Sequence, residues 1–186
     1  MNDYSIALFL HIVGALGFFA ALGLEWTGLR QIRNAVAPQQ VGAWMGVLKS
    51  TRRMSFVSML TTVISGIYMM VTVWGAVPWV MVAVGSLVVV IVLSLALTGP
   101  RMAAIGQALA LEKGQLSQTF RSLANHPLLW LSIQTRVAIA LGIVFLKVVK
   151  PELDGSLLTI GVAIILGLAS VLPIPRREQV QEGSAN

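Results

Sequence analysis

The stretch VPWVMVAVGSLVVVIVLSLAL at residues 77–97 contains no charged residue. It is long enough to cross the hydrocarbon core of a bilayer as an α-helix, which takes about 20 apolar residues. Four more apolar stretches flank it, at residues 5–29, 54–74, 128–149 and 156–172, and the last is the shortest. Peptide groups in lipid must form their hydrogen bonds within their own segment, as they do in an α-helix. These stretches therefore predict an all-α, polytopic transmembrane helical bundle of about five spans.

The composition supports the same fold class. Charged residues make up 11% of the 186 residues, and hydrophobic residues make up 56%. A soluble domain carries roughly 25% charged residues, because its surface faces water. We therefore predict one transmembrane domain at residues 1–175, with the lipid bilayer as its main partner, and a polar cytoplasmic tail at residues 176–186.

The formal net charge of +6 is spread over the segments between the apolar stretches. This pattern is typical of loops that face anionic lipid, and it argues against a nucleic-acid partner. The absence of cysteine excludes disulfides and thiolate metal sites. Hydrolase and nucleotide-binding motifs are also absent. The sequence therefore predicts neither catalytic residues nor a metal site, and we do not expect an enzyme.

The segments between the spans differ in length. Residues 75–78 form a tight turn, which predicts that the second and third spans are an antiparallel hairpin. The segment at residues 30–53 is expected to be a loop with a short interfacial helix at residues 41–49. The segment at residues 101–123 has a partly helical pattern that Gly114 interrupts, which suits a helix lying on the membrane or projecting from it.

The basic residues predict an orientation. In a five-span arrangement, ten of the thirteen basic residues fall on one side of the membrane. Lys147 and Lys150 fall on the other side, and Arg136 lies within a span. The positive-inside rule then places the N-terminus outside and the C-terminus in the cytoplasm. The ten residues are Arg30, Arg33, Lys49, Arg52, Arg53, Arg101, Lys113, Arg121, Arg176 and Arg177.

Three ionisable residues stand out within the spans, namely His11, Glu25 and Arg136, because a charge there costs about 2.5–3.5 kcal/mol on insertion scales. Arg136 lies about nine residues from the cytoplasmic end of its span and Glu25 about four, and because both side chains are long we expect them to meet in an ion pair. Together with His11, they predict a polar seam shared by the first, second and fourth spans. The predicted seam consists of His11, Glu25, Ser58, Thr61, Thr62, Ser65, Tyr68, Gln134 and Arg136.

The seam has more than one interpretation. The ion pair can serve only to fix the helix register, or Arg136 can extend alone towards the headgroups. Alternatively, the seam is a substrate or proton pathway.

His11 has its own alternatives. It is either a buried hydrogen-bonded side chain, with Tyr68 as a candidate partner, or a proton-linked group, or a ligand of haem or copper. His126 is predicted at the other end of the bundle, so the two histidines cannot bind one iron. We expect His126, which precedes Pro127, to mark a helix start. No cofactor is predicted by any motif; His11 is the candidate cofactor ligand, and a His/Met pair with Met69 or Met70 of the second span stays open.

Two passages resemble known families. LHIVGA at residues 10–15 resembles the first helix of several bacterial membrane families, including the copper-resistance D (CopD-type) domain. ALGIVFLKVVKP at residues 140–151 is similar to the end of the fourth helix in a bacterial family of predicted integral membrane proteins of unknown function, which also carries a histidine in its first helix. The resemblance covers the first four spans. It implies a fold and a bacterial cytoplasmic (inner) membrane, not an activity, and a copper role would fall on His11 alone.

These observations predict a small multi-pass membrane protein that acts as a non-enzymatic subunit or interaction protein, with itself or another membrane protein as a possible partner. A transporter or proton-linked permease that uses His11, Glu25 and Arg136 is the first alternative. A haem- or copper-binding membrane protein is the second.

Overall fold

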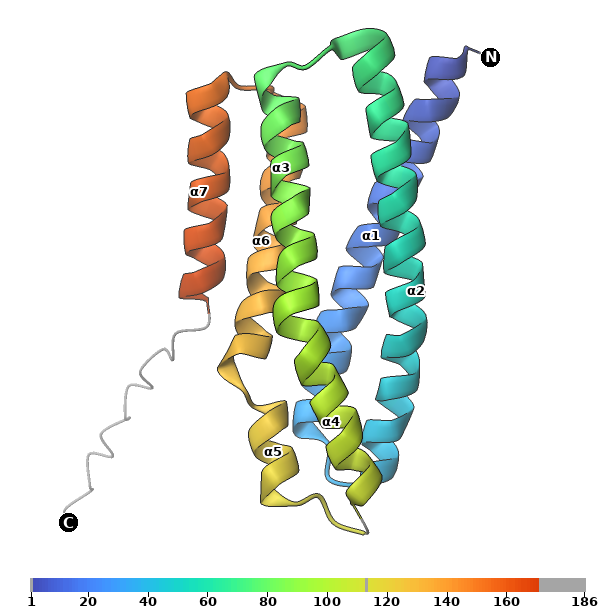
Figure 1. Cartoon of the computed structure of the whole chain (residues 1–186), viewed down its shortest axis with the longest axis vertical. Helices are drawn as coiled ribbons and strands as arrows, with labels where there is room; N and C mark the ends of the chain where they lie inside the picture. The colour runs from blue at the N-terminus through green and yellow to red at the C-terminus, as the bar shows by residue number, and fades with distance from the viewer. Residues whose placement is uncertain (1, 113, 171–186) are drawn as a thin grey trace, which may run out of the picture.

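The computed structural model describes residues 2–112 and 114–170, which form helices joined by short turns, without a strand (Figure 1). The predicted tail at residues 176–186 and the last residues of the fifth apolar stretch lie outside this part of the chain. Two π-helical turns, labelled η, interrupt the α-helices. The elements are α1 Asp3–Asn34, α2 Pro38–Met69, η1 Met70–Trp74, α3 Pro78–Leu93, η2 Ser94–Thr98, α4 Gly99–Leu111, α5 Gln118–Ala124, α6 Pro127–Val149 and α7 Leu153–Ala169.

Within the described residues, four continuous helical stretches are long and apolar enough to cross a membrane. α7 is apolar but shorter, with 17 residues. The structure is therefore an all-helical bundle, as the sequence predicts. The four long stretches are Asp3–Asn34, Pro38–Trp74, Pro78–Leu111 and Gln118–Val149.

The helices pack in two groups. α1 and α2 lie against each other along most of their length, while α6 packs against α3 and α7 (Figure 1). The predicted turn between the second and third spans is present, with Gly75 at a φ of 69°. α2 and α3 run antiparallel, but each packs mainly against other helices rather than against its hairpin partner.

The loop predicted at residues 30–53, with its separate interfacial helix at 41–49, is wrong. α1 continues to Asn34, and α2 begins at Pro38 and runs without a break into the second span. Proline suits the first turn of a helix because a backbone N–H at that position has no hydrogen-bond partner within the helix, so the lack of an N–H costs no hydrogen bond. Val41 and Leu48 are buried seven residues apart, so one face of this extension packs into the core.

A similar extension follows the third span. α3 passes through η2 directly into α4, so the helix does not end at residue 97. α4 ends at Leu111, and α5 begins at Gln118 after a turn in which Gly114 has a φ of 98°. The predicted interruption at Gly114 is thus confirmed. α4 continues the axis of the bundle and projects from its lower end in Figure 1.

The two ends of the bundle differ in charge. We call the basic end the part formed by residues 26–53 and 99–130, where Arg33 lies over the Trp130 ring at 5.4 Å. At the opposite end, the Trp74 and Trp79 rings lie 5.3 Å apart beside Lys150. Tryptophan near basic groups is typical of membrane interfaces.

Exposed large hydrophobic side chains are dense between these ends. Along α1 they extend from Ile6 to Leu24, and on the continuous stretch of α2 and η1 they extend from Phe56 to Val73. The 21 steps from Asp3 to Leu24 span about 32 Å at roughly 1.5 Å per residue, which matches a hydrocarbon core of about 30 Å. The basic end therefore extends beyond the part of the bundle that suits lipid.

Candidate functional site

Two glycines bring α1 and α2 into close contact. A Cβ atom added to Gly14 would lie 2.5 Å from Thr62 Oγ1 and 2.9 Å from the Ser58 carbonyl oxygen. A Cβ atom added to Gly17 would lie 2.4 Å from Ser58 Oγ. The two glycines therefore let α2 approach α1 closely, and this contact sets the register that brings the polar side chains of α2 next to those of α1.

Next to this contact lies the histidine cluster, which we define as His11, Thr62, Ser65 and Lys147. His11 is 8% exposed, and its Nδ1 lies 2.9 Å from the Thr62 carbonyl oxygen and 3.3 Å from Ser65 Oγ. Lys147 Nζ, from α6, contacts His11 Nε2. The cluster therefore joins α1, α2 and α6 near the end of the bundle where α1 begins.

The contacts of His11 define its tautomer. A carbonyl oxygen can only accept, so Nδ1 must donate to Thr62, and the neutral ring then presents Nε2 as an acceptor for Lys147. Nε2 is the nitrogen that a metal would need, and it faces a cationic side chain instead. This geometry does not favour the haem or copper hypothesis. Among the described residues, no group of three or more histidine, aspartate or glutamate side chains is placed to hold a metal ion.

The arginine cluster, which we define as Glu25, Thr98, Ser132 and Arg136, lies near the basic end. Arg136 Nη1 donates to Glu25 Oε2 at 3.0 Å, and Nη2 donates to Glu25 Oε1 at 2.5 Å. This bidentate pair is the one ion pair that the structure shows within residues 2–112 and 114–170. The side chain of Arg136 is 4% exposed and that of Glu25 is 20% exposed, so the pair is largely removed from solvent.

Hydroxyl groups extend the arginine cluster to α3. Arg136 Nη2 also donates to Thr98 Oγ1 at 3.2 Å, and Thr98 Oγ1 lies 2.9 Å from Ser132 Oγ. Ser132 Oγ donates to the Leu93 carbonyl oxygen at 3.1 Å, so Thr98 is the donor to Ser132. The result is a chain of hydrogen bonds from α1 through α6 to the π turn that follows α3.

Several predicted seam residues lie elsewhere. Tyr68 is 40% exposed and makes no hydrogen bond to His11, whose partners are Thr62 and Ser65. Thr61 donates to the Val57 carbonyl of its own helix. Gln134 faces α7, where it lines a surface hollow with Leu166 and other apolar residues. Helix α2 therefore presents only part of its hydroxyl-bearing residues to the interior.

Three residues of the clusters were not predicted from the sequence. Lys147 lies near the end of its span, where sequence analysis assigns it to solvent. Thr98 and Ser132 carry no charge, and hydroxyl groups are common in apolar helices. The signal that could have found Lys147 is its position, since it lies eleven residues, about three turns, beyond Arg136 on the same helix.

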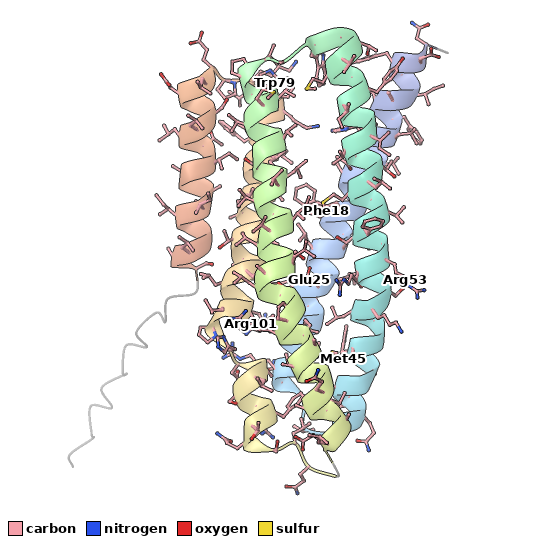
Figure 2. All side chains as sticks on the ribbon, in the orientation of Figure 1. Phe18, Glu25, Met45, Arg53, Trp79 and Arg101 are labelled. Carbon is pink, nitrogen blue, oxygen red and sulfur yellow. The ribbon has the colours of Figure 1, made fainter. Side chains whose placement is uncertain are left out.

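An apolar layer separates the two clusters. Along α1, Phe18 and Leu22 lie between His11 and Glu25, and both belong to the buried core. Figure 2 labels Phe18 and Glu25 on this helix. Along α6, the buried residues between Arg136 and Lys147 include Ile139 and Ile143. The predicted seam is thus divided into two polar sites, one near each end of the apolar part of the bundle.

A cavity of about 520 Å³ adjoins the arginine cluster. It is lined by residues of α1, α2, η2, α4 and α6, among them both Glu25 and Arg136. Lys49 and Arg52 line it from α2 and are exposed, so the cavity can be reached from outside. His11 does not line it. His126 also lies outside both clusters and caps α6, where its Nδ1 accepts from the Leu128 N–H, as a helix-start residue should.

The fold and these sites define the chain as a helical bundle with several membrane-compatible helices and two internal polar clusters. No protein-family model, curated protein or solved structure matches the chain. The resemblance of residues 10–15 and 140–151 to bacterial membrane families therefore stays a prediction.

Proposed function

We propose that the protein is a non-enzymatic subunit or interaction protein of a bacterial cytoplasmic membrane, which it crosses five times with its basic end in the cytoplasm. The observation that carries the proposal is that the ionisable side chains within the spans pair with one another across helices. Glu25 binds Arg136 with both oxygens, and His11 uses both ring nitrogens. Groups that satisfy each other in this way hold helices in register.

The apolar layer between the clusters supports this proposal over a pathway. A proton or substrate moving along the bundle from His11 to Glu25 would cross the level of Phe18 and Leu22, where buried residues pack together. The distance between the two ionisable residues is about 21 Å along α1 for fourteen residues at about 1.5 Å each. A transporter or proton-linked permease remains the second candidate, because the cavity reaches Glu25 and Arg136.

A flux measurement separates the two candidates. The purified chain is placed in liposomes with an internal pH-sensitive dye, and a potential is imposed across the bilayer. We expect proton entry equal to that of protein-free liposomes. Entry that depends on the protein and disappears in Glu25→Gln would overturn the subunit proposal in favour of the permease.

The proposed orientation has a direct test, since the chain contains no cysteine. A single cysteine is introduced at Asn2 or at Ser122, which is exposed on α5. In intact cells, a membrane-impermeant maleimide should label Asn2→Cys and spare Ser122→Cys until the cells are opened. The reverse pattern would contradict the orientation, and labelling of both would contradict the membrane crossing itself.

The interaction partner should contact the basic end. This end carries a few exposed apolar side chains outside the membrane-compatible part, namely Val36, Val47 and Leu111. A photo-crosslinking residue at Leu111, which is 82% exposed, should give a discrete protein adduct in cells. The same group at Phe56, on the lipid-compatible face of α2, serves as the control. Adducts at Phe56 alone would place the partner within the bilayer instead.

A further inference from the structure

The cavity beside the arginine cluster carries more positive than negative charge. Arg136 is neutralised by Glu25 through the bidentate pair. Lys49 and Arg52 lie one turn apart on α2, both line the cavity, and neither forms an ion pair with a described residue. Two cationic groups therefore face this space without a carboxylate partner.

Hydrogen-bond donors in the cavity wall are also available. Ser55 lies one turn beyond Arg52 and lines the same space. Arg136 is buried, and its Nε has no hydrogen-bond partner among the described residues. The Ser55 hydroxyl can donate a hydrogen bond to an acceptor that enters the cavity.

The remaining wall is apolar. Leu29, Met45 and Met102 line the cavity from α1, α2 and α4. The cavity also lies at the level of Glu25, where the exposed hydrophobic residues of α1 end at Leu24. It thus combines a cationic side and an apolar side at the depth where lipid headgroups meet acyl chains.

We propose that this cavity binds a phosphate group, presented by an anionic membrane lipid whose acyl chain lies against the apolar wall. Guanidinium groups recognise phosphate oxygens through paired hydrogen bonds, and lysine adds a point charge. Anionic lipids are abundant in the cytoplasmic leaflet, towards which basic segments are drawn. The site does not depend on the subunit proposal, because a protein of either proposed function can hold a lipid here.

The test measures lipid binding to the full-length chain in detergent by native mass spectrometry. The probes are short-chain phosphatidylglycerol, short-chain phosphatidylcholine and inorganic phosphate. We expect one phosphatidylglycerol to bind saturably, with at least tenfold preference over phosphatidylcholine, and millimolar inorganic phosphate to compete. If inorganic phosphate binds saturably and phosphatidylglycerol does not, the phosphate group does not come from a lipid. If neither probe binds saturably, the cavity is not a phosphate-binding site.

Matched variants distinguish the cavity from the general attraction of basic residues for anions. Arg52→Gln should weaken phosphatidylglycerol binding at least tenfold. Arg53→Gln, next in the chain, should change it less than twofold, because Arg53 does not line the cavity and points away from the bundle (Figure 2). Equal losses in the two variants would contradict the proposal. Both side chains are exposed, and an unchanged unfolding temperature checks that both variants fold.

A second pair of variants tests the cavity without removing a charge, since one variant fills it and the other does not. Gly46 lines the cavity, and a Cβ atom added to it meets no atom within 4 Å. Gly46→Leu should therefore fold and reduce phosphatidylglycerol binding at least tenfold. Gly42→Leu, one turn earlier and equally open but outside the cavity, should bind normally. Normal binding in both variants would place the lipid elsewhere.

Discussion

Both polar clusters provide partners for ionisable side chains inside the bundle, but they do so through different kinds of contact. In the arginine cluster an acid meets a base, so Glu25 and Arg136 remain charged and their charges cancel. In the histidine cluster two bases meet, and the contact between His11 and Lys147 holds only when the imidazole is neutral and its Nε2 accepts a hydrogen bond from the lysine ammonium group. The first is an ion pair and the second is a hydrogen bond to a neutral ring. The comparison teaches that burial alone does not predict how much a polar contact stabilises the bundle.

The largest difference should appear when one partner of the ion pair is removed. Glu25→Ala leaves Arg136 buried without its counter-ion, and breaking a buried pair in this way costs about 3–5 kcal/mol. Unfolding of the purified chain in mixed detergent micelles measures the loss.

The control for this variant replaces both partners. Glu25→Leu with Arg136→Met removes both charges and should restore most of the stability, since an apolar pair of similar volume is often neutral. If Glu25→Ala unfolds like the parent chain, the arginine cluster stabilises the bundle no more than the histidine cluster does. The difference in stability drawn between the two clusters would then be wrong.

The close contact of α1 and α2 should rank second. Gly14→Ala places a methyl group within 3 Å of the Ser58 and Thr62 backbone, and such overpacking costs about 1–3 kcal/mol. Gly23→Ala on the same helix meets no atom within 4 Å and should be neutral or stabilising by up to about 1 kcal/mol. The difference between their unfolding midpoints checks the contact, and equal midpoints would refute it.

The histidine cluster should respond less than the ion pair. Lys147→Met keeps the length of the side chain and removes one hydrogen bond to a neutral ring, which is worth about 1 kcal/mol. The same unfolding experiment measures it. A loss as large as that of Glu25→Ala would contradict the assignment of this contact as a hydrogen bond to a neutral ring.

The smallest effect should come from the hydroxyl chain. Ser132→Ala removes the hydrogen bonds to Thr98 and to the Leu93 carbonyl, and hydrogen bonds between membrane helices average about 0.6 kcal/mol. Ser122→Ala, exposed on α5, provides the baseline. A loss above about 2 kcal/mol would mean that the hydroxyl chain, and not the ion pair, positions Arg136.

The sequence predicted the helical bundle and the Glu25–Arg136 contact for a common reason. Charged residues are rare in apolar stretches, so two of opposite sign whose long side chains can reach each other are informative. The same reasoning missed Lys147, because a lysine near a span end is usually solvated. It also misplaced Tyr68, because depth counted from span ends cannot give the rotation of α2 about its axis.

The continuity of α3 with α4, and of the second span with the beginning of α2, was missed for a different reason. Hydropathy measures how much of a helix suits lipid, whereas helix length depends on caps and breakers. Pro38 and Leu111 mark the real boundaries, and both lie outside the apolar stretches. The partition of polar residues between two clusters depends on the register of α1 against α2, and one sequence does not encode that register in a visible pattern.

The π turn at Ser94–Thr98 has a consequence for the history of the chain. An α-helix rotates by about 100° for each residue, so one residue more or less at this turn would change the phase of everything that follows it. Ile105 is fully buried on α4, and a chain shortened by one residue here would rotate that side chain out of the core. Length changes at this turn should therefore be selected against more strongly than substitutions, and relatives of this protein should differ here in residue type and not in residue number.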